Sequence, residues 1–318
     1  MKTTIIIPTL NRPTEVETTL NFLLQSDNLP NQVIIIDQSD STKTKELVEK
    51  ETYKDLHVLY ISSEIKSSAL ARNIGIEKRN KDSDIIIFLD DDVQVEENFI
   101  SQIKNFFKEN KQAKGGVANI ETPSRKTTLS KKIGLFLLTG KVNTTKFFVS
   151  KGGFNALPMK VGEKVKVAER TSGCGMFFYK SVFEQGFRFE KQFMKYSLME
   201  DCFLSYEIQK KYPNSLFFVP NIKMVHCETP TARIANKQKI YQNIIHRYYF
   251  IKKFNKSFFC YSWTMFVFSI FDLLQYKSRK ILQYYYEGIK YVLQHKKDIG
   301  EEKFNFNSFI FGEDFDKS

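Results

Sequence analysis

The 318-residue sequence lacks the patterns that mark secreted, disulfide-stapled proteins. Its four cysteines, Cys174, Cys202, Cys227 and Cys260, form neither a CxxC pair nor a dense disulfide framework. We therefore expect reduced thiols, packed as small apolar residues, in a cytosolic protein. The N-terminal run TTIIIPTL is short, is broken by Pro8 and has no small-residue cleavage site, so we expect no secretory signal.

Two common kinds of phosphate-binding loop are also missing. No GxGxxG follows the first apolar run, and no GxxxxGK[ST] occurs anywhere in the chain. These absences exclude a dinucleotide fold of the usual kind and a P-loop. Any phosphate must be held by another device, and a divalent metal on carboxylates is the obvious one.

No helix-turn-helix, zinc or RNP-like motif accompanies the formal net charge of +12. Lys and Arg number 33 against 28 Asp and Glu over residues 1–230, and 13 against 2 over residues 231–297. The tail, 298–318, is acidic, with 2 basic and 6 acidic residues. The basic excess therefore lies in one late segment, and we expect no nucleic-acid partner.

The first 120 residues alternate apolar runs with helical stretches. The runs TTIIIP, QVIIID, HVLYIS and DIIIFLD lack polar alternation, which is typical of strands buried on both faces of a parallel sheet. Helices are expected near 13–25, 42–51, 67–78 and 96–107. The pattern predicts an α/β fold with a mostly parallel central sheet flanked by helices.

Polar residues follow each predicted strand at its carboxyl end, where ligands collect in such sheets. Three of them are consecutive aspartates, whose mutual repulsion makes burial costly without a partner. A solvated acidic turn is one interpretation, and a site for Mg²⁺ or Mn²⁺ is the other. The clusters at these strand ends are Pro8, Thr9, Asn11 and Arg12 after the first strand, Asp37, Ser39 and Asp40 after the second, Ser62 and Ser63 after the third, and Asp90, Asp91 and Asp92 after the fourth.

Six segments occur in the order and spacing of one enzyme family. They are IIIPTLNR, VIIIDQSDS, SALARNIGIE, FLDDDV, SGCGMFFYKSVFEQGFRFE and MEDCFLSYEIQKK. Over roughly residues 3–230 the chain resembles the family 2 glycosyltransferases. The resemblance implies a GT-A fold, a nucleotide-sugar donor (UDP-, GDP- or dTDP-sugar) and transfer of a hexosyl or deoxyhexosyl group.

The resemblance also implies where the donor binds. Pro8 and Thr9 would line the nucleotide pocket, and Asp37 would hydrogen-bond the base. Arg72 would hold the base or the diphosphate. Asp92 would bind the metal, with Asp90 nearer the ribose and Asp91 at the variable middle position. Asn11, Arg12 and Ser39 are assigned to the same donor site.

Several of these residues have a structural alternative. Asp37, Ser39 or Asp40 would also serve as a helix cap. Asn11 and Arg12 would also serve to begin a helix before Pro13. Arg72 is equally typical of an ordinary helix-surface arginine, and these alternatives stay open at this point.

A second acidic element lies in YSLMEDCFLSYEIQKKY, where the spacing of apolar residues predicts a helix opening near Glu200. Carboxylates in a first helical turn are also favoured by the helix dipole. The resemblance makes Asp201 the catalytic base, with Glu200 beside it. It also makes His226 a metal ligand, although a lone histidine is as often structural.

The loop before the fifth apolar strand, TSGCGMFFYK, has two glycines that allow close backbone approach to a ligand. In the family this loop serves donor sugar and acceptor, and Gly153 in KGGFN is expected to border the same cleft. The link over 121–169 matches no pattern, and we expect it to help choose the acceptor.

Departures from the family pattern refine the function. DQSD replaces the usual DDGS, which leaves the base contact less defined, and QNIIHRYYF differs from the QxxRW of processive synthases, which favours single-sugar addition. The alternative function is a nucleotide-sugar-binding or pyrophosphorylase-like protein. It is disfavoured because PTLNRPTEV contains no glycine. Glycoside hydrolysis would need a second carboxylate and leave the aspartates unused.

We predict a catalytic domain over 1–230, with a nucleotide-binding half at 1–120 and an acceptor and catalytic half at 121–230. A helical, basic region follows over 231–318. Its uncharged run, 257–271, is shorter than the roughly twenty residues that span a bilayer.

After that run, the apolar residues Ile281, Leu282, Tyr285, Ile289, Val292 and Leu293 recur at helical spacing opposite lysines. This basic amphipathic helix would lie in an anionic membrane interface or pack on the catalytic domain. The resemblance implies an enzyme that extends glycans for capsule or lipopolysaccharide at the cytoplasmic face. Together with this helix, it leads us to expect a peripheral enzyme at the inner face of the cell membrane that meets a lipid-linked acceptor.

Overall fold

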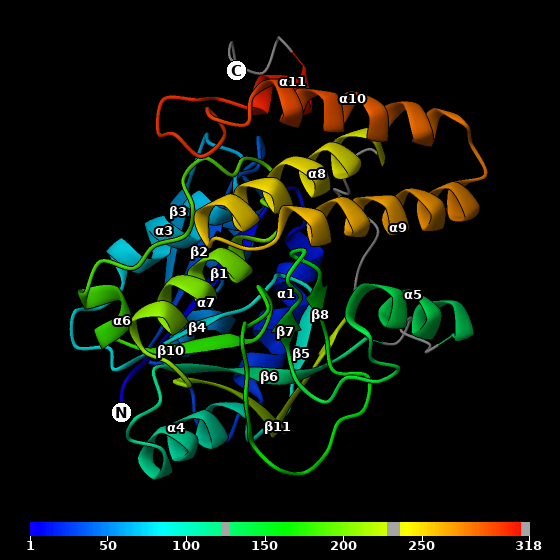
Figure 1. Cartoon of the computed structure of the whole chain (residues 1–318). Helices are drawn as coiled ribbons and strands as arrows, with labels where there is room; N and C mark the ends of the chain where they lie inside the picture. The colour runs from blue at the N-terminus through cyan, green and yellow to red at the C-terminus, as the bar shows by residue number, and fades with distance from the viewer. Residues whose placement is uncertain (123–127, 228–235, 313–318) are drawn as a thin grey trace. The chain divides into compact units, whose positions relative to one another are not determined.

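The four apolar runs near the N-terminus form neighbouring parallel strands (Figure 1). The computed structural model describes residues 1–122, 128–227 and 236–312. The spatial order of these strands is β3-β2-β1-β4, so their carboxyl ends meet at one edge of the sheet. Their bounds are β1 Thr3–Thr9, β2 Gln32–Asp37, β3 Val58–Ser62 and β4 Ile85–Phe88.

The helices between these strands follow the predicted ones with two differences. The stretch predicted as one helix over 42–51 is split, so that a short α-helix is followed by a 3-10 helix and both bury apolar residues. The helix predicted from residue 96 begins three residues later, because β5 and a turn come first. The helices are α1 Pro13–Leu24, α2 Lys43–Val48, η1 Glu51–Leu56, α3 Ser68–Lys78 and α4 Phe99–Glu109.

The sheet continues beyond β4 as a mixed sheet. β10 runs antiparallel between β4 and β6, and β11 runs parallel to β6. The sheet was predicted to be mostly parallel, and its strands are parallel over β3-β2-β1-β4 and between β6 and β11, while β5, β9 and β10 run antiparallel to their neighbours. The remaining elements of this unit are β5 Val93–Val95, β6 Gly115–Glu121, β9 Lys166–Val167, β10 Met176–Tyr179, β11 Leu216–His226, α6 Ser181–Glu184 and α7 Glu200–Lys211.

A register shift interrupts β11. Val219 pairs with Ala118 and Lys223 pairs with Asn119, so three residues of β11 lie between two consecutive pairs. The first piece of the strand packs into the core, and the second piece pairs with β5 up to His226 opposite Val93. The irregularity is a β-bulge that bends the strand before it reaches the aspartates.

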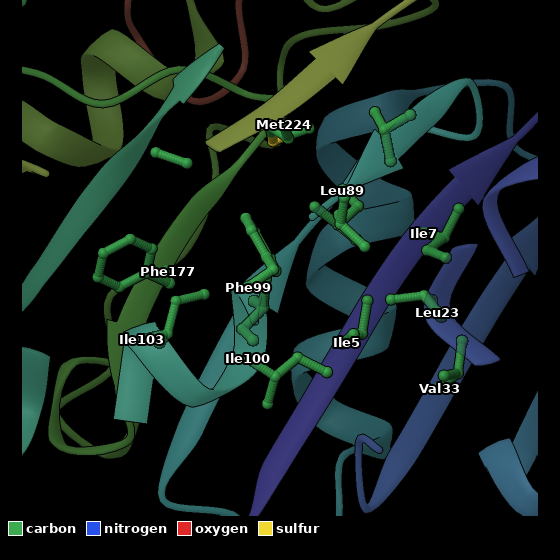
Figure 2. Packing of buried hydrophobic residues seen from close by; sticks show 14 of the residues in the cluster. Ile5, Ile7, Leu23, Val33, Leu89, Phe99, Ile100, Ile103, Phe177 and Met224 are labelled. Carbon is green, nitrogen blue, oxygen red and sulfur yellow. The ribbon is translucent and has the colours of Figure 1, made fainter. Parts of the chain in front are cut away.

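The main hydrophobic core lies between the sheet and its flanking helices (Figure 2). Figure 2 shows Ile5 and Val33 of neighbouring strands with Leu23 of α1, and Ile103 of α4 near Phe177 of β10. All of these side chains are buried. The runs that form β1, β2 and β4 are buried on both faces, as the pattern predicted. β3, at the edge of the sheet, differs because its residues are only partly buried and Leu59 is exposed.

Two compact units divide the chain. The first comprises Met1–Lys126 and Val161–Ala232, and the second comprises Thr127–Lys160 and Arg233–Ser318. The second unit consists of helices and a two-stranded sheet. Its elements are α5 Leu129–Thr139, β7 Phe148–Val149, β8 Asn155–Ala156, α8 Asn236–Lys253, α9 Phe258–Tyr276, α10 Lys280–Gln294 and α11 Asn307–Phe311.

The predicted catalytic domain over 1–230 differs from this division, because residues 127–160 cluster with the C-terminal helices. Arg247 of α8 explains the difference, since its buried guanidinium donates to the carbonyl oxygen of Gly153 and, at 2.8 Å, to Asn155 Oδ1. Gly153, which we expected to border the substrate cleft, lies in this contact. The predicted boundary between residues 230 and 231 lies outside the described residues.

Replacing Arg247 with methionine is expected to lower the free energy of unfolding of the second unit by about 2–4 kcal/mol. The variant leaves the Gly153 carbonyl without its charged donor, while the side-chain volume is nearly kept. Urea unfolding followed by the fluorescence of Trp263, the one tryptophan of the chain, reports on this unit. Lys239→Met, an exposed change on the same helix, is the control, and equal unfolding midpoints of the two variants would contradict the assignment.

The amphipathic helix predicted near residue 281 is α10, and its apolar face is covered in part. Ile281, Tyr285 and Val292 are buried, and an added Cβ at Gly288 would lie 2.7 Å from Ile244 of α8. The packed alternative describes these three residues, although they lie in the second unit with α8. Leu282 and Leu293, which were predicted on the same face, are exposed.

The uncharged run over 257–271 lies almost entirely in a helix, α9, that extends beyond the end of the run. α9 has 19 residues, because the helix continues past Asp272 to Tyr276. Among the residues that the structure describes, it is the one helix whose length and composition alone would suffice to cross a membrane, and 22% of its most apolar window is buried.

Candidate active site

Asp37, at the end of β2, is fully buried and has partners on both carboxylate oxygens. The amide nitrogen of Ser39 donates to Oδ1 at 3.0 Å, and the hydroxyl of Tyr60 donates to Oδ2 at 3.0 Å. Burial, and then the bond to Asp37, raises the pKa of Tyr60 to about 12. Asp37 closes its own loop and caps no helix, because α2 begins only at Lys43.

The loops after β1 and β2 are joined next to Asp37. The amide nitrogen of Asn11 donates to Ser39 Oγ at 2.6 Å, and Asn11 adopts a left-handed backbone with φ 56°. Pro8 and Thr9 are the last residues of β1, and Pro8 pairs with Ile36 of β2. These residues lie along one stretch of the sheet edge.

The middle aspartate of the triplet points into the protein. Asp91 accepts hydrogen bonds from Thr9 Oγ1 and from Arg12 Nη1, both at 2.7 Å. Burial raises the pKa of Asp91 to about 7, although Arg12 and Thr9 act in the opposite direction. The second guanidinium nitrogen of Arg12 donates to Asp92 Oδ2 at 2.7 Å. Arg12 and Asp91 were assigned to the donor site, and the structure shows their charged groups bound to each other.

The outer two aspartates converge on His226 at the end of β11. His226 Nε2 lies 3.0 Å from Asp92 Oδ1 and 3.7 Å from Asp90 Oδ2. Asp92 is buried, whereas 30% of the Asp90 side chain is exposed. The antiparallel pairing of His226 with Val93 explains the approach, since it sets the histidine beside the residue that follows Asp92.

Cys174 completes this group and was missed as a functional residue. One ligand atom each of Asp90, Cys174 and His226 lies within 4.8 Å of the other two. The strand register accounts for the meeting. Met176 pairs with Phe88, and two residues further along the same antiparallel register Cys174 lies opposite Asp90. The sequence contained one signal, the SGCGM loop before an apolar strand, but not the partner of that strand.

Arg72 ties the aspartates to α7. It is buried, which excludes the surface-arginine alternative. Its guanidinium bonds to the Glu200 carboxylate, donates to Asp90 Oδ1 at 2.9 Å and approaches the carbonyl oxygen of Gly173 at 3.4 Å. Ser68 Oγ donates to the other Glu200 oxygen at 3.0 Å. Glu200 therefore holds Arg72 in place.

Asp201, the predicted base, begins α7 next to this network. Its Oδ2 accepts from Arg170 Nη1 at 3.0 Å and from the amide nitrogen of Gly173 at 3.1 Å. Its Oδ1 accepts from the amide nitrogen of Cys202 at 2.7 Å. The carboxylate is thus oriented by three donors, Oδ1 retains a free lone pair whereas Oδ2 accepts two hydrogen bonds, and 14% of the side chain is exposed.

The Gly173–Gly175 loop connects Asp201 to the aspartates. Gly173 bonds to Asp201 and contacts Arg72, and Cys174, the next residue, lies beside Asp90. Gly175 has φ +74°, and an added Cβ there would lie 2.6 Å from the sulfur of Met224. The predicted close approach exists, but the neighbours that require it are protein groups.

Charges in this network do not balance. Carboxylates outnumber guanidinium groups six to three among the joined side chains, so three negative charges remain when His226 is neutral and Asp91 is ionised. The nine side chains are Glu15, Asp90, Asp91, Asp92, Glu200, Asp201, Arg12, Arg72 and Arg170. A divalent cation would neutralise most of this excess.

Comparisons with known proteins agree with this geometry. The sequence profile described as Glycosyl transferase family 2 matches residues 4–187, more than half of the chain. A comparison with curated proteins finds no match.

Two solved structures illustrate the fold. TarS 1-349 of S. aureus in complex with UDP-GlcNAc has 13% sequence identity and a TM-score of 0.52, over 78% of this chain and 66% of that one. GalNAc-T7 with UDP, GalNAc and Mn²⁺ has 14% identity and a TM-score of 0.59, over 79% and 50%. The chain thus spans half to about two thirds of those structures. With the profile match and the shared mixed α/β fold, the chain belongs to glycosyl transferase family 2 and is a glycosyltransferase of the GT-A fold.

Proposed function

We propose that this glycosyltransferase is metal-dependent and inverting, and that it moves one sugar from a nucleotide-sugar donor to a glycan or lipid-linked glycan in cell-surface polysaccharide synthesis. One observation carries the proposal. The loop 173–174 bonds to Asp201 through the Gly173 amide and reaches Asp90 through Cys174. A cation on the aspartates and a base for the acceptor would then act on the same small region.

The donor atoms at the rim suit a divalent transition metal. Asp90 offers a hard oxygen and His226 an imidazole nitrogen, and the nitrogen favours Mn²⁺ over Mg²⁺. Burial raises the pKa of the Cys174 thiol, so the thiol would stay protonated beside the ion. Asp90 and His226 would hold the ion, with Asp92 in contact with His226 as the third candidate. When bound, the metal would neutralise charge on the leaving diphosphate.

The base step needs only Asp201. A hydroxyl oxygen of the acceptor would form a bond to the anomeric carbon from the face opposite the diphosphate, as the carbon–oxygen bond to the diphosphate breaks. The hydroxyl proton would pass to an Asp201 oxygen. Arg170 and the Gly173 amide keep that carboxylate in one orientation, which is the requirement for a positioned base.

The nucleoside part of the donor would lie over the ends of β1 and β2. Pro8, Thr9, Asn11, Asp37 and Ser39 meet there, and the hydrogen bonds among them shape the edge. Because both Asp37 oxygens already have partners, a base contact would use a second lone pair of a carboxylate oxygen. The UDP in the two related structures supports a uridine nucleotide as the first donor to test.

A calorimetric and thermal-shift screen tests the proposal. Full-length enzyme is titrated with UDP-, GDP- and dTDP-sugars, each with and without Mn²⁺. We expect one donor to bind and to raise the unfolding temperature only when Mn²⁺ is present, since a ligand bound to the native state alone raises stability. Equal binding of the donor in excess EDTA would contradict metal dependence.

His226→Ala is expected to weaken Mn²⁺ binding by about tenfold to a hundredfold, because the variant removes the imidazole nitrogen nearest both aspartates. Electron paramagnetic resonance of free Mn²⁺ gives the affinity without turnover. His295→Ala in α10's C-cap, outside the first unit, is the matched control. An unchanged affinity in His226→Ala would remove the histidine from the metal site.

We also propose that the enzyme works at the cytoplasmic face of the cell membrane, where a lipid-linked acceptor would be exposed. The basic excess over 231–297 supports this location, because the inner leaflet is anionic.

A further inference from the structure

We infer that α5 and α9 together form a docking face for an anionic lipid bilayer. The inference extends the proposed function, on which its link to a lipid-linked acceptor rests, but the docking itself is measurable without any sugar transfer. It also moves the membrane contact away from α10, where the sequence had suggested it.

One face of α9 is apolar and open to solvent. Exposed side chains recur along the helix at steps of three and four residues, which places them on a single stripe. Phe259 is 82% exposed and Leu274 is 67% exposed. The stripe consists of Phe259, Trp263, Phe266, Ile270 and Leu274.

The other side of α9 is packed. Tyr261, Thr264 and Met265 are buried, and the Tyr261 hydroxyl donates to the carbonyl oxygen of Ile244 in α8 at 3.0 Å. Asp272, the one acidic residue of α9, accepts from the Tyr285 hydroxyl at 2.8 Å. The helix is therefore fixed along one side by its own unit, so it would lie in the plane of a bilayer surface and not cross the bilayer.

α5 carries a second apolar stripe next to the first. Leu129, Ile133, Phe136 and Leu137 are exposed, and Leu129 reaches 74%. The indole nitrogen of Trp263 donates to the carbonyl oxygen of Leu137 at 2.7 Å, and Gly134 lies against the ring of Phe271. These contacts join both helices within the second unit, so the stripes form one surface. We call these nine side chains of α5 and α9 the apolar face.

Charge identifies the partner of the apolar face. By sequence the second unit has 21 Lys and Arg against 8 Asp and Glu, whereas the first has 27 against 28. The segment 128–146 has no acidic residue, and lysines flank the stripes. The nearby cations in the sequence are Lys131, Lys132, Lys141, Lys277, Arg279 and Lys280.

A surface that is apolar in the middle and cationic at its edges matches a bilayer with anionic headgroups. Aromatic rings enter the interface, while long basic side chains reach back to the phosphates. A second copy of the chain would bring a unit of the same net charge, +13, and would be repelled. An exposed apolar face of nine side chains is typical of a surface that binds a membrane or a partner.

Trp263 makes the test direct, because it is the only tryptophan of the chain and lies within the apolar face. Full-length protein is mixed with vesicles of phosphatidylglycerol and phosphatidylcholine, with pure phosphatidylcholine vesicles, and with soluble glycerol phosphate. We expect a blue shift of emission, and quenching by brominated lipid, only with the anionic vesicles. Raising the salt concentration should weaken binding.

Two double variants locate the contact. Phe259→Ser with Leu274→Ser is expected to lower vesicle partitioning about tenfold or more, since two apolar side chains lose their burial. Leu282→Ser with Tyr286→Ser, on the exposed side of α10, is the matched control and should bind as wild type. Both pairs are exposed, so folding should be kept, and circular dichroism checks this.

Each remaining outcome overturns the inference. Absence of binding by the wild type would do so, as would loss of binding only in the α10 pair. A wild-type dimer that the α9 pair converts to monomers would assign the face to a second copy. Binding of glycerol phosphate alone would reduce the site to an anion site. Donor binding by the Phe259→Ser, Leu274→Ser variant is measured separately by calorimetry. Normal donor binding in a variant that no longer binds vesicles would show that membrane docking is tested independently of the proposed function.

Discussion

Asp201→Asn is expected to lower the rate of sugar transfer by about a hundredfold to ten-thousandfold, the usual contribution of a positioned base. The amide cannot take the acceptor proton. It also sets its own nitrogen against Arg170 or the Cys202 amide, which both donate to the carboxylate. Initial rates with the donor that the screen identifies measure the loss, and calorimetry should show near-normal binding of donor and Mn²⁺.

Glu46→Gln is the matched control for this change. Glu46 is an exposed acid in the first turn of α2, as Asp201 is an acid in the first turn of α7, but Glu46 lies outside the candidate site. Full activity in Asp201→Asn would show that Asp201 is not the base. A variant that lost donor binding to the same degree as turnover would indicate a binding role.

The second large effect is expected from Asp90→Asn, for which we predict a loss of Mn²⁺ affinity of about a hundredfold or more and a matching loss of turnover. Asp90 is the half-exposed carboxylate of the group with Cys174 and His226. Removing its charge should weaken the attraction for a cation more than it weakens the fold. Electron paramagnetic resonance and thermal unfolding measure the two quantities.

The adjacent aspartate supplies the contrast. Asp91→Asn should lower the free energy of unfolding by about 2 kcal/mol, because the Asp91 carboxylate is buried against Thr9 and Arg12. Its Mn²⁺ affinity should stay within a few-fold of wild type. An equal loss of Mn²⁺ affinity in Asp91→Asn and Asp90→Asn would contradict the separate roles of the two carboxylates, of which Asp91 bonds to Thr9 and Arg12 and Asp90 lies near His226.

Local patterns predicted the elements and several neighbours of the site. The apolar runs predicted β1 to β4, and the rule that strand ends share one edge predicted that the loops after β1 and β2 meet, as Asn11 and Ser39 do. The resemblance, and not this rule, assigned Arg72 of α3 to the donor site. The cysteine at 174 escaped because its meeting with Asp90 depends on the pairing of β10 with β4, strands separated by almost ninety residues in the sequence. Nothing local encodes such a register.

The C-terminal region shows the same limit. The apolar periodicity of α10 and the uncharged run of α9 were both visible, but periodicity alone does not tell which stripe is covered. In the structure Ile281 and Tyr285 of α10 are buried, whereas Phe259 of α9 is exposed. The place of residues 127–160 likewise depends on Arg247, a contact between segments far apart in the chain.

The register shift in β11 lies inside the core. Val219, Ile222 and Met224 are buried in the same cluster, so the residues on both sides of the shift are packed. A length change within residues 220–222 would therefore disturb packing as well as pairing. The place of His226 opposite Val93 depends on that packed segment, so the end of the strand is coupled to the scaffold.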